Sequence, residues 1–178
     1  VCIAAQTAFW INLFNAALLR DAPELELAAE ERDVLAFLER PRLRMFGQRF
    51  SLDDLQHGIL RGNLPRHGRL RPPMPRDDPR LAYMPIAYDE RLHFALHVAT
   101  RSSPGFAVFE PGHVDRQLEE AACAYVRRVS RVERGGAVVV APRLLQWYAA
   151  DFGGEHGVLE FVLARLEDER AIDLVERQ

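Results

Sequence analysis

The sequence contains no lysine, so each of its 23 basic residues is arginine. With 26 acidic residues beside them, the chain carries a formal net charge of only -3. A nearly neutral chain has no overall field that would attract nucleic acid or an anionic membrane surface. The charge balance therefore implies no partner of either kind.

Cysteine is also scarce. The two cysteines, Cys2 and Cys123, are too few for a disulfide framework, and neither belongs to a C-x-x-C pair. No H-x-H, H-E-x-x-H or mixed Cys and His spacing typical of zinc sites occurs. His93 and His97 would lie about 13 Å apart along a strand, which is too far to share one ion. We therefore expect neither a metal centre nor a cofactor.

Long apolar runs are absent as well. No stretch reaches the roughly 18 to 20 apolar residues of a membrane span, and no charged leader precedes an apolar segment. We therefore expect no membrane-spanning helix. Because the sequence starts at Val1, a removed export signal would leave no trace, and the compartment stays open between cytoplasmic and exported.

The apolar residues that are present suffice for one hydrophobic core. The 178 residues are 48% hydrophobic and 28% charged, which is typical of a globular protein. We therefore expect a single domain over residues 1–178. The apolar segment 2–20 predicts a helix that ends before Asp21, and residues 24–40 predict a surface helix that ends at Pro41.

Two pairs of polar residues stand out in the first third of the chain. Asn12 and Asn15 share one face of the apolar helix, so we expect both amides to bond to backbone elsewhere, with a direct role in a site as the alternative. Ser51 and Asp54 form a pattern typical of a capping box. That box predicts a helix over residues 52–61.

Residues 61–80 contain six arginines among many prolines and glycines, which predicts a long loop. Arginines could grip phosphates, but no aromatic residues are interleaved to stack bases, and Asp77 and Asp78 partly neutralise the charge. We expect a solvated loop, with a lid over a site as the alternative.

The remaining pattern indicates further helices and a few strands. Alternating apolar residues in the stretch 92–98 predict a strand. Turn and capping signals predict hairpins over residues 45–51 and about 129–141, the latter turning at Gly135-Gly136, and helices over residues 115–127, 142–152 and about 157–165. We therefore expect an α+β domain, mostly helical, with a small, largely antiparallel sheet that includes His93 to Val98.

Four residues are candidates for chemistry. Gln56 falls on the apolar face of its predicted helix, with His57 at the edge of that face, and such a conflict often marks a site. The alternative is a Gln bonded to backbone beside a surface His. Ser102 and Ser103 follow the predicted strand, and His57 could act as a base for either one. No G-x-S-x-G pattern surrounds these serines, so the alternative is that they bond to neighbouring backbone.

Four motifs in order resemble a bacterial and plant family catalogued as domain of unknown function 547. They are AFWINLFNAALL, SLDDLQHGILRGN, HFALHVATRSSP and LLQWYAADFG, and they span about residues 9–153. In that family an acidic residue usually precedes the His of the second motif, and cysteines occur after the strand and before the proline of the third. The resemblance therefore implies a cysteine-hydrolase constellation and a cysteine-peptidase-like fold.

The chain departs from the family pattern at the implied site. Gln56 stands at the acid position, Val98 and Ser103 stand at the cysteine positions, and His97 stands where the family tends to carry Asn. Val98 can neither ionise nor attack, and Gln56 cannot offset the charge of an imidazolium. We therefore expect a non-catalytic, divergent member of a hydrolase-like family that keeps a cleft for a small-molecule or peptide ligand. The alternative is a weak hydrolase of peptide or amide bonds that uses Ser103 with His57.

Overall fold

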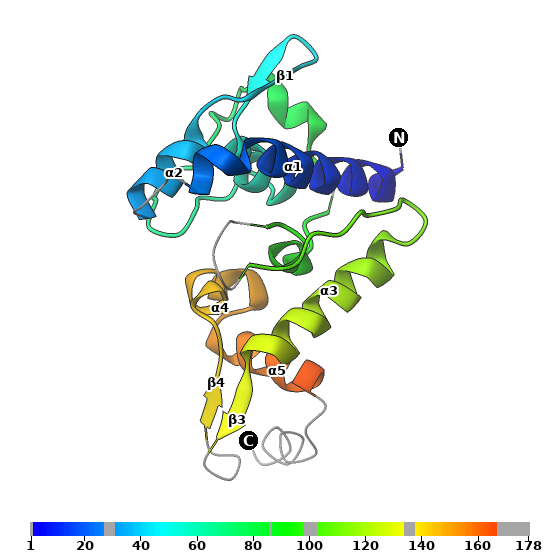
Figure 1. The fold of residues 1–178 in the computed structure, drawn as a ribbon, viewed down its shortest axis with the longest axis vertical. Coiled ribbons are helices and arrows are strands. Elements are labelled where there is room, and N and C mark those ends of the chain that lie inside the picture. The colour runs from blue at the N-terminus through cyan, green and yellow to red at the C-terminus, as the bar shows by residue number, and fades with distance from the viewer. Residues whose placement is uncertain (1, 27–30, 86, 98–102, 134–137, 167–178) are drawn as a thin grey trace.

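The computed structural model describes residues 2–26, 31–85, 87–97, 103–133 and 138–166. It is mostly helical and forms two halves, one above the other in Figure 1. The upper half holds α1 (Ile3–Glu26), α2 (Glu31–Glu39), β1 (Leu43–Met45) and β2 (Gln48–Phe50). The lower half holds α3 (Val114–Val129), β3 (Arg131–Glu133), β4 (Val138–Val140), α4 (Arg143–Trp147) and α5 (Glu155–Leu166). The shorter helical segments are the π-helix η1 (Asp54–Leu60) and the 3-10 helices η2 (Pro79–Tyr83), η3 (Glu90–Phe94) and η5 (Ala149–Phe152).

The strands within these ranges form two separate antiparallel hairpins, β1 with β2 and β3 with β4. Between β1 and β2 the chain turns at Phe46 and Gly47, which have positive φ values of 51° and 74°. Two positive φ values suit the right-handed twist of a tight hairpin. Both predicted hairpins and the α+β class are thus confirmed, although the turn at Gly135-Gly136 lies outside the described residues.

The predicted strand at His93 to Val98 is wrong. η3 contains His93 and ends at Phe94, and the chain then turns away. Residues 92–96 are all buried, so the alternation of apolar side chains does not separate a core face from a solvent face. The side chain of Asp89 accepts a hydrogen bond from the Arg91 N–H and so starts a helical turn. Val98 lies outside the described residues.

α1 is longer than the sequence predicts. It continues through Pro23 to Glu26, past the expected end before Asp21. The carboxylate of Asp21 pairs with the guanidinium groups of Arg20 and Arg42 instead of capping a new segment. The helix therefore does not end at this acidic residue.

The helices of the lower half lie close to their predicted places. Asp115 lies within the first turn of α3 and does not cap it, since His113 occupies the position before the helix. Pro142 directly precedes α4, as expected from its fixed φ. Gly153, with a φ of 86°, ends η5 in the left-handed conformation that favours glycine.

Two clusters of buried apolar side chains form the core, one centred on each half. The upper cluster packs α1 against β2, η1 and the segment that follows η3, and includes Trp10, Ile11, Phe14, Phe50, Leu55 and Ile59. The lower cluster packs α3, α4 and α5 around Phe94 and includes Tyr125, Val126, Leu145, Phe161 and Val162. η3 therefore lies between the clusters and contributes to both.

Two amides of α1 attach it to the irregular segments of the chain. The Asn12 side chain donates to the Phe109 carbonyl and accepts from the Phe109 N–H, each at 2.8 Å. The Asn15 side chain donates to the Ala95 carbonyl at 2.9 Å and accepts from the His97 N–H at 3.1 Å. The predicted backbone-bonding role of both amides is confirmed.

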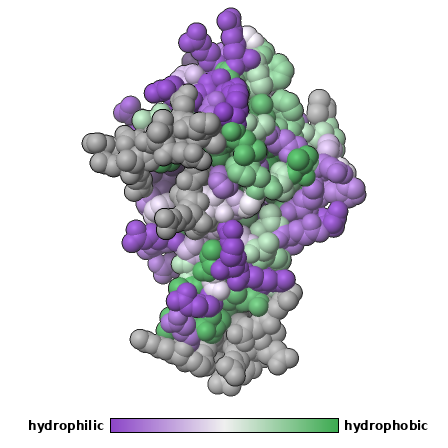
Figure 2. Space-filling view, viewed as in Figure 1, coloured by the Kyte–Doolittle hydropathy of each residue, from purple (hydrophilic) through white to green (hydrophobic). Residues whose placement is uncertain are grey.

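The surface mixes polar and apolar residues. In the space-filling view, hydrophobic residues of the upper half lie directly beside strongly hydrophilic ones (Figure 2). Of the helices in the described ranges, none has both the length and the apolar character needed to cross a bilayer.

Candidate functional site

The motif SLDDLQHGIL begins with a capping box and continues as a π-helix. The Ser51 N–H donates to Asp54 Oδ2 and the Asp54 N–H donates to Ser51 Oγ, both at 2.9 Å, which confirms the predicted box. The turn then widens, because the Arg61 N–H donates to the Gln56 carbonyl five residues earlier, at 2.9 Å. π-helices are rare and occur frequently at functional sites. The motif thus combines a capping box with a π-helix and stays a candidate site.

The widened turn buries both candidate residues of the motif. Gln56 is 6% exposed and His57 is 1% exposed, so His57 is not the surface residue of the alternative interpretation. The next residue is Gly58, and a Cβ there would come within 2.6 Å of the end of the Met74 side chain. Glycine therefore allows the long loop to close directly over the π-helix.

One nitrogen of the His57 imidazole faces two polar groups, the Tyr148 hydroxyl and the Asp53 carboxylate. Its Nε2 lies 3.4 Å from the Tyr148 hydroxyl and 3.8 Å from Asp53 Oδ1. Its Nδ1 is buried and has no hydrogen-bond partner in the described part of the chain. Burial, followed by repulsion from the Arg61 guanidinium, holds the pKa of His57 well below its ordinary value of 6.5. The side chain is therefore a neutral imidazole at physiological pH.

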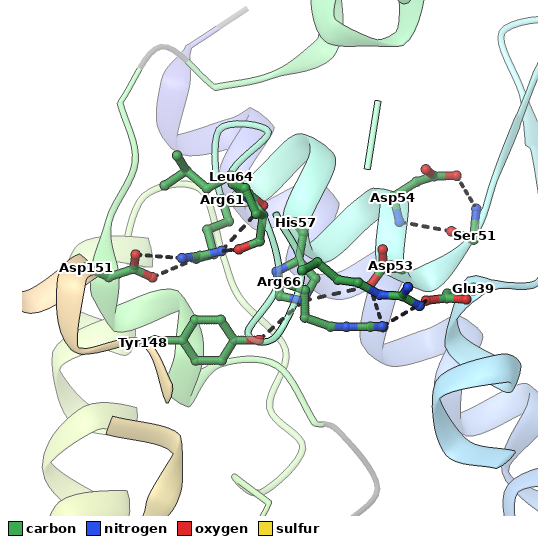
Figure 3. A network of polar contacts seen from close by, with 12 residues as sticks. Glu39, Ser51, Asp53, Asp54, His57, Arg61, Leu64, Arg66, Tyr148 and Asp151 are labelled. Carbon is green, nitrogen blue, oxygen red and sulfur yellow. Dashed lines mark hydrogen bonds and ion pairs between the residues drawn. The ribbon is translucent and has the colours of Figure 1, made fainter. Parts of the chain in front are cut away.

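Asp151 is the centre of a buried polar cluster, and Figure 3 shows its contact with Arg61. The Arg61 guanidinium binds it with two hydrogen bonds, Nε to Oδ2 at 2.6 Å and Nη2 to Oδ1 at 2.7 Å. The Tyr88 hydroxyl donates to Oδ2 at 2.8 Å, and His93 Nε2 lies 2.7 Å from the same oxygen. Three side chains, from the segments around Arg61 and around residues 88–93, thus converge on one carboxylate.

Tyr148 separates the two histidines. Its ring stacks on His93 with 4.3 Å between centroids and on His57 with 5.8 Å between centroids. The guanidinium carbon of Arg61 lies 4.6 Å from the centre of the same ring, within the range of a cation–π interaction. Burial raises the pKa of Tyr148 to about 12, so its hydroxyl stays protonated. The tyrosine ring therefore fills the space beside His57.

The charges of the cluster follow from burial and from pairing. Burial alone would raise the pKa of Asp151, but hydrogen bonds from His93, Arg61 and Tyr88 outweigh it and hold that pKa well below its ordinary value of 3.8. Burial lowers the pKa of His93, although the bond to Asp151 opposes this. Burial also raises the pKa of Tyr88. The cluster thus contains one paired carboxylate and guanidinium, with neutral imidazoles and phenols around them.

The other predicted site residues have contacts of their own or lie outside the described residues. His97 Nδ1 lies 2.7 Å from the Pro104 carbonyl oxygen, and its ring stacks on Phe106. Ser103 is buried, and its carbonyl accepts a hydrogen bond from the Arg128 guanidinium at 2.7 Å. Val98 and Ser102 belong to the part of the chain that is not described.

A polar cavity of about 350 Å³ opens beside the π-helix. Its walls are Glu39 at the end of α2, the turn around Ser51 to Asp54, and loop residues from Arg66 to Pro73. Asp53 connects it to the site, because one of its carboxylate oxygens faces both the Arg66 guanidinium, at 3.1 Å, and His57, at 3.8 Å. Part of the predicted loop therefore covers a hollow next to His57.

Sequence patterns missed several members of the buried cluster. Arg61, Tyr88, Tyr148 and Asp151 were not among the predicted site residues, although the motif LLQWYAADFG was recognised. The sequence feature that indicates Asp151 is its position as a carboxylate in an otherwise apolar helical segment. Buried charges are rare unless they are paired, so such a residue predicts a buried ion pair. Within the described ranges, no group of three or more His, Cys, Asp or Glu side chains is arranged to hold a metal ion.

Comparison with known proteins identifies one related family. The family model described as "Protein of unknown function, DUF547" matches residues 4–126, well over half of the chain. No curated protein and no solved structure matches the chain. The family resemblance predicted from the sequence motifs is thus confirmed, while Tyr148 and Asp151 lie beyond the matched segment.

Proposed function

This chain belongs to the DUF547 family, and we propose that it is a divergent, non-catalytic member that keeps a binding cleft beside His57. The observation that carries the proposal is the burial of His57, whose side chain is 2% exposed and stacks on Tyr148. A general base must come within hydrogen-bond reach of the proton that it removes, either directly or through one water molecule. A buried, neutral imidazole behind a tyrosine ring is poorly placed for that task.

The residues around His57 support the same proposal. The family resemblance implies an acid and two cysteines, and this chain has Gln56, Val98 and Ser103 at those positions. The nearest carboxylate in the described structure, on Asp53, lies 3.8 Å from His57 Nε2, which is beyond hydrogen-bond distance. An imidazolium formed at His57 would therefore lack the close acidic partner that stabilises it in hydrolase triads.

One observation favours the alternative, a weak hydrolase of peptide or amide bonds that uses Ser103 with His57. The Nδ1 atom of His57 is buried and has no hydrogen-bond partner in the described structure, so in the tautomer with the proton on Nε2 it is available to take a proton from a nucleophile. Against it, Ser103 is itself buried, at 5% exposure. A substrate would need both groups to become accessible.

A fluorophosphonate probe, which labels activated serines, distinguishes the two functions. We expect no labelling of the wild-type protein at neutral pH, under conditions in which a serine hydrolase in the same tube is labelled. Ser103→Ala would be compared with Ser130→Ala, because Ser130 is also buried and its Oγ has no partner in the described structure. Wild-type labelling that survives in Ser130→Ala and disappears in Ser103→Ala would refute the non-catalytic proposal.

A further inference from the structure

Four of the six arginines in the loop 61–80 are already held by carboxylates. Arg61 binds Asp151, and Arg80 binds Asp78 and Asp54. The other two held arginines, Arg66 and Arg69, both pair with Glu39 on α2, at 2.8 Å and 3.0 Å.

Arg71 and Arg76 are the two arginines of the loop that bind no carboxylate of the described residues. Both are exposed, and neither forms a hydrogen bond or ion pair with any residue in the described ranges. Arg71 lines the cavity beside the π-helix, whereas Arg76 does not. The cavity therefore contains one guanidinium, that of Arg71, which forms no ion pair with a described carboxylate.

The loop that carries Arg71 is anchored at a narrow neck. The Asn63 side chain donates to the Met74 carbonyl at 3.0 Å and accepts from the Met74 N–H at 3.1 Å. Met74 is fully buried against the core, which fixes this end of the loop. A loop closed in this way presents its side chains in a set arrangement, so that a ligand loses less conformational freedom on binding.

The three carboxylates of the cavity also have spare acceptor capacity. All hydrogen bonds of Glu39 in the described structure fall on Oε1, those of Asp53 fall on Oδ1, and those of Asp54 fall on Oδ2. One oxygen of each group is thus left to accept a hydrogen bond from a ligand. The guanidinium groups of Arg66 and Arg69 are already paired with these carboxylates, so Arg71 is the cavity arginine left to bind an anion, which favours a ligand with a single negative charge.

We propose that this cavity binds a small carboxylate that also carries hydroxyl or amino donors, with the ligand carboxylate on Arg71 and its donors facing Asp53 and Glu39. The volume of about 350 Å³ lies at the small end of ligand pockets and suits a molecule of the size of an amino acid. The inference rests on the proposed binding function and assigns it a site and a ligand class. It also gives a role to the arginine-rich loop.

Titration with glycolate, a hydroxylated monocarboxylate, tests the site, and the Nε–H signals of the arginines are followed by NMR spectroscopy. We expect saturable binding that shifts the Arg71 signal, about tenfold weaker binding in Arg71→Ala, and unchanged binding in Arg76→Ala. Arg76 is the matched control because it is exposed, lies in the same loop and carries the same charge. Inorganic phosphate should bind more weakly than glycolate.

Several outcomes would overturn the site. One is that glycolate binding to the wild-type protein does not saturate. Others are that Arg71→Ala binds glycolate as tightly as the wild type, or that Arg76→Ala weakens binding as much as Arg71→Ala does. The last is that phosphate binds more tightly than glycolate. None of them depends on the fluorophosphonate result. Labelling at Ser103 would refute the non-catalytic proposal, whereas a failed titration would refute the carboxylate site alone.

Discussion

Replacing Asp151 with Asn removes the charge at the centre of the buried cluster while it keeps the shape of the side chain. The side chains of Arg61 and Asp151 are 9% and 3% exposed, so the guanidinium would stay buried without a counter-charge. The new amide also carries two N–H donors, which would face donors on Arg61 or Tyr88. Asp151→Asn therefore both removes an ion pair and creates unsatisfied hydrogen bonds.

The expected loss of stability is large for a single substitution. Breaking a buried ion pair by removing one partner typically costs about 3–5 kcal/mol. The whole free energy of unfolding of a domain is about 5–15 kcal/mol. We therefore expect Asp151→Asn to leave a protein that is folded but markedly closer to its unfolding transition.

Urea denaturation at neutral pH, followed by circular dichroism, measures this loss. The midpoint should fall in Asp151→Asn while the slope with urea stays unchanged, as expected for a change in stability alone. Glu133→Gln is the control, because Glu133 pairs with Arg131 at an exposed site where an ion pair is worth about 0–1 kcal/mol.

A double-mutant cycle with Arg61→Met separates the pair from other effects. Removing both charges leaves no buried unpaired charge, so the double variant should lose less stability than the sum of the single losses. If Asp151→Asn cost no more than Glu133→Gln, or if the two single losses simply added, the cluster would not act as a coupled unit. The reasoning about its charges would then be refuted.

Two further predictions concern protonation and close packing. His57 and His93 have a pKa below 6.5 in the folded chain, so the unfolded chain binds protons more readily, and the free energy of unfolding should fall as the pH drops below about 6.5. Urea midpoints measured from pH 8 to 5.5 test this, and a His57→Phe protein with the same pH slope as the wild type would contradict it. Gly157→Ala should lower the thermal midpoint by the equivalent of about 1–3 kcal/mol, because its Cβ would overlap the Phe152 carbonyl. Gly112→Ala, where a Cβ meets no atom within 4 Å, is the control, and equal midpoints for the two proteins would contradict the prediction.

Local patterns predict the parts of the fold that depend on near neighbours in the sequence. The capping box of Ser51 and Asp54 involves residues three apart, and both of its hydrogen bonds are present. The amides of Asn12 and Asn15 are likewise bonded to backbone, because a polar side chain on a buried helix face must find a partner. The partners themselves could not be predicted, since they lie 80 or more residues away.

The failed strand prediction at His93 has a specific physical cause. Period-two alternation indicates a strand when one face is buried and the other meets solvent. Here His93 is as buried as its apolar neighbours Leu92 and Phe94, because Asp151 and Tyr88 satisfy its ring nitrogen. The pattern therefore assigns the polar residue His93 to a solvent-facing side of a strand, although its side chain is buried.

The centre of the candidate site could not be predicted for a related reason. Arg61 and Asp151 are 90 residues apart, and the neighbouring sequence of neither indicates that they pair. The sequence places His57 at the edge of the apolar face of a helix, but its ring stacks on Tyr148, which is 91 residues away. Contacts between residues far apart in the sequence therefore determine the charge and burial of the site. Local sequence indicates only which segments supply its residues.

The π-helix carries one residue more than regular helical winding needs. A π-turn holds one residue more than an α-turn through nearly the same rotation, so a single-residue deletion between Asp54 and Leu60 would restore α-helical winding and leave the Arg61 side chain close to its orientation toward Asp151. The deletion would instead remove the widened turn that contains Gln56 and His57. Homologous chains that are one residue shorter in this segment should therefore form an ordinary α-helix here and keep the ion pair between Arg61 and Asp151.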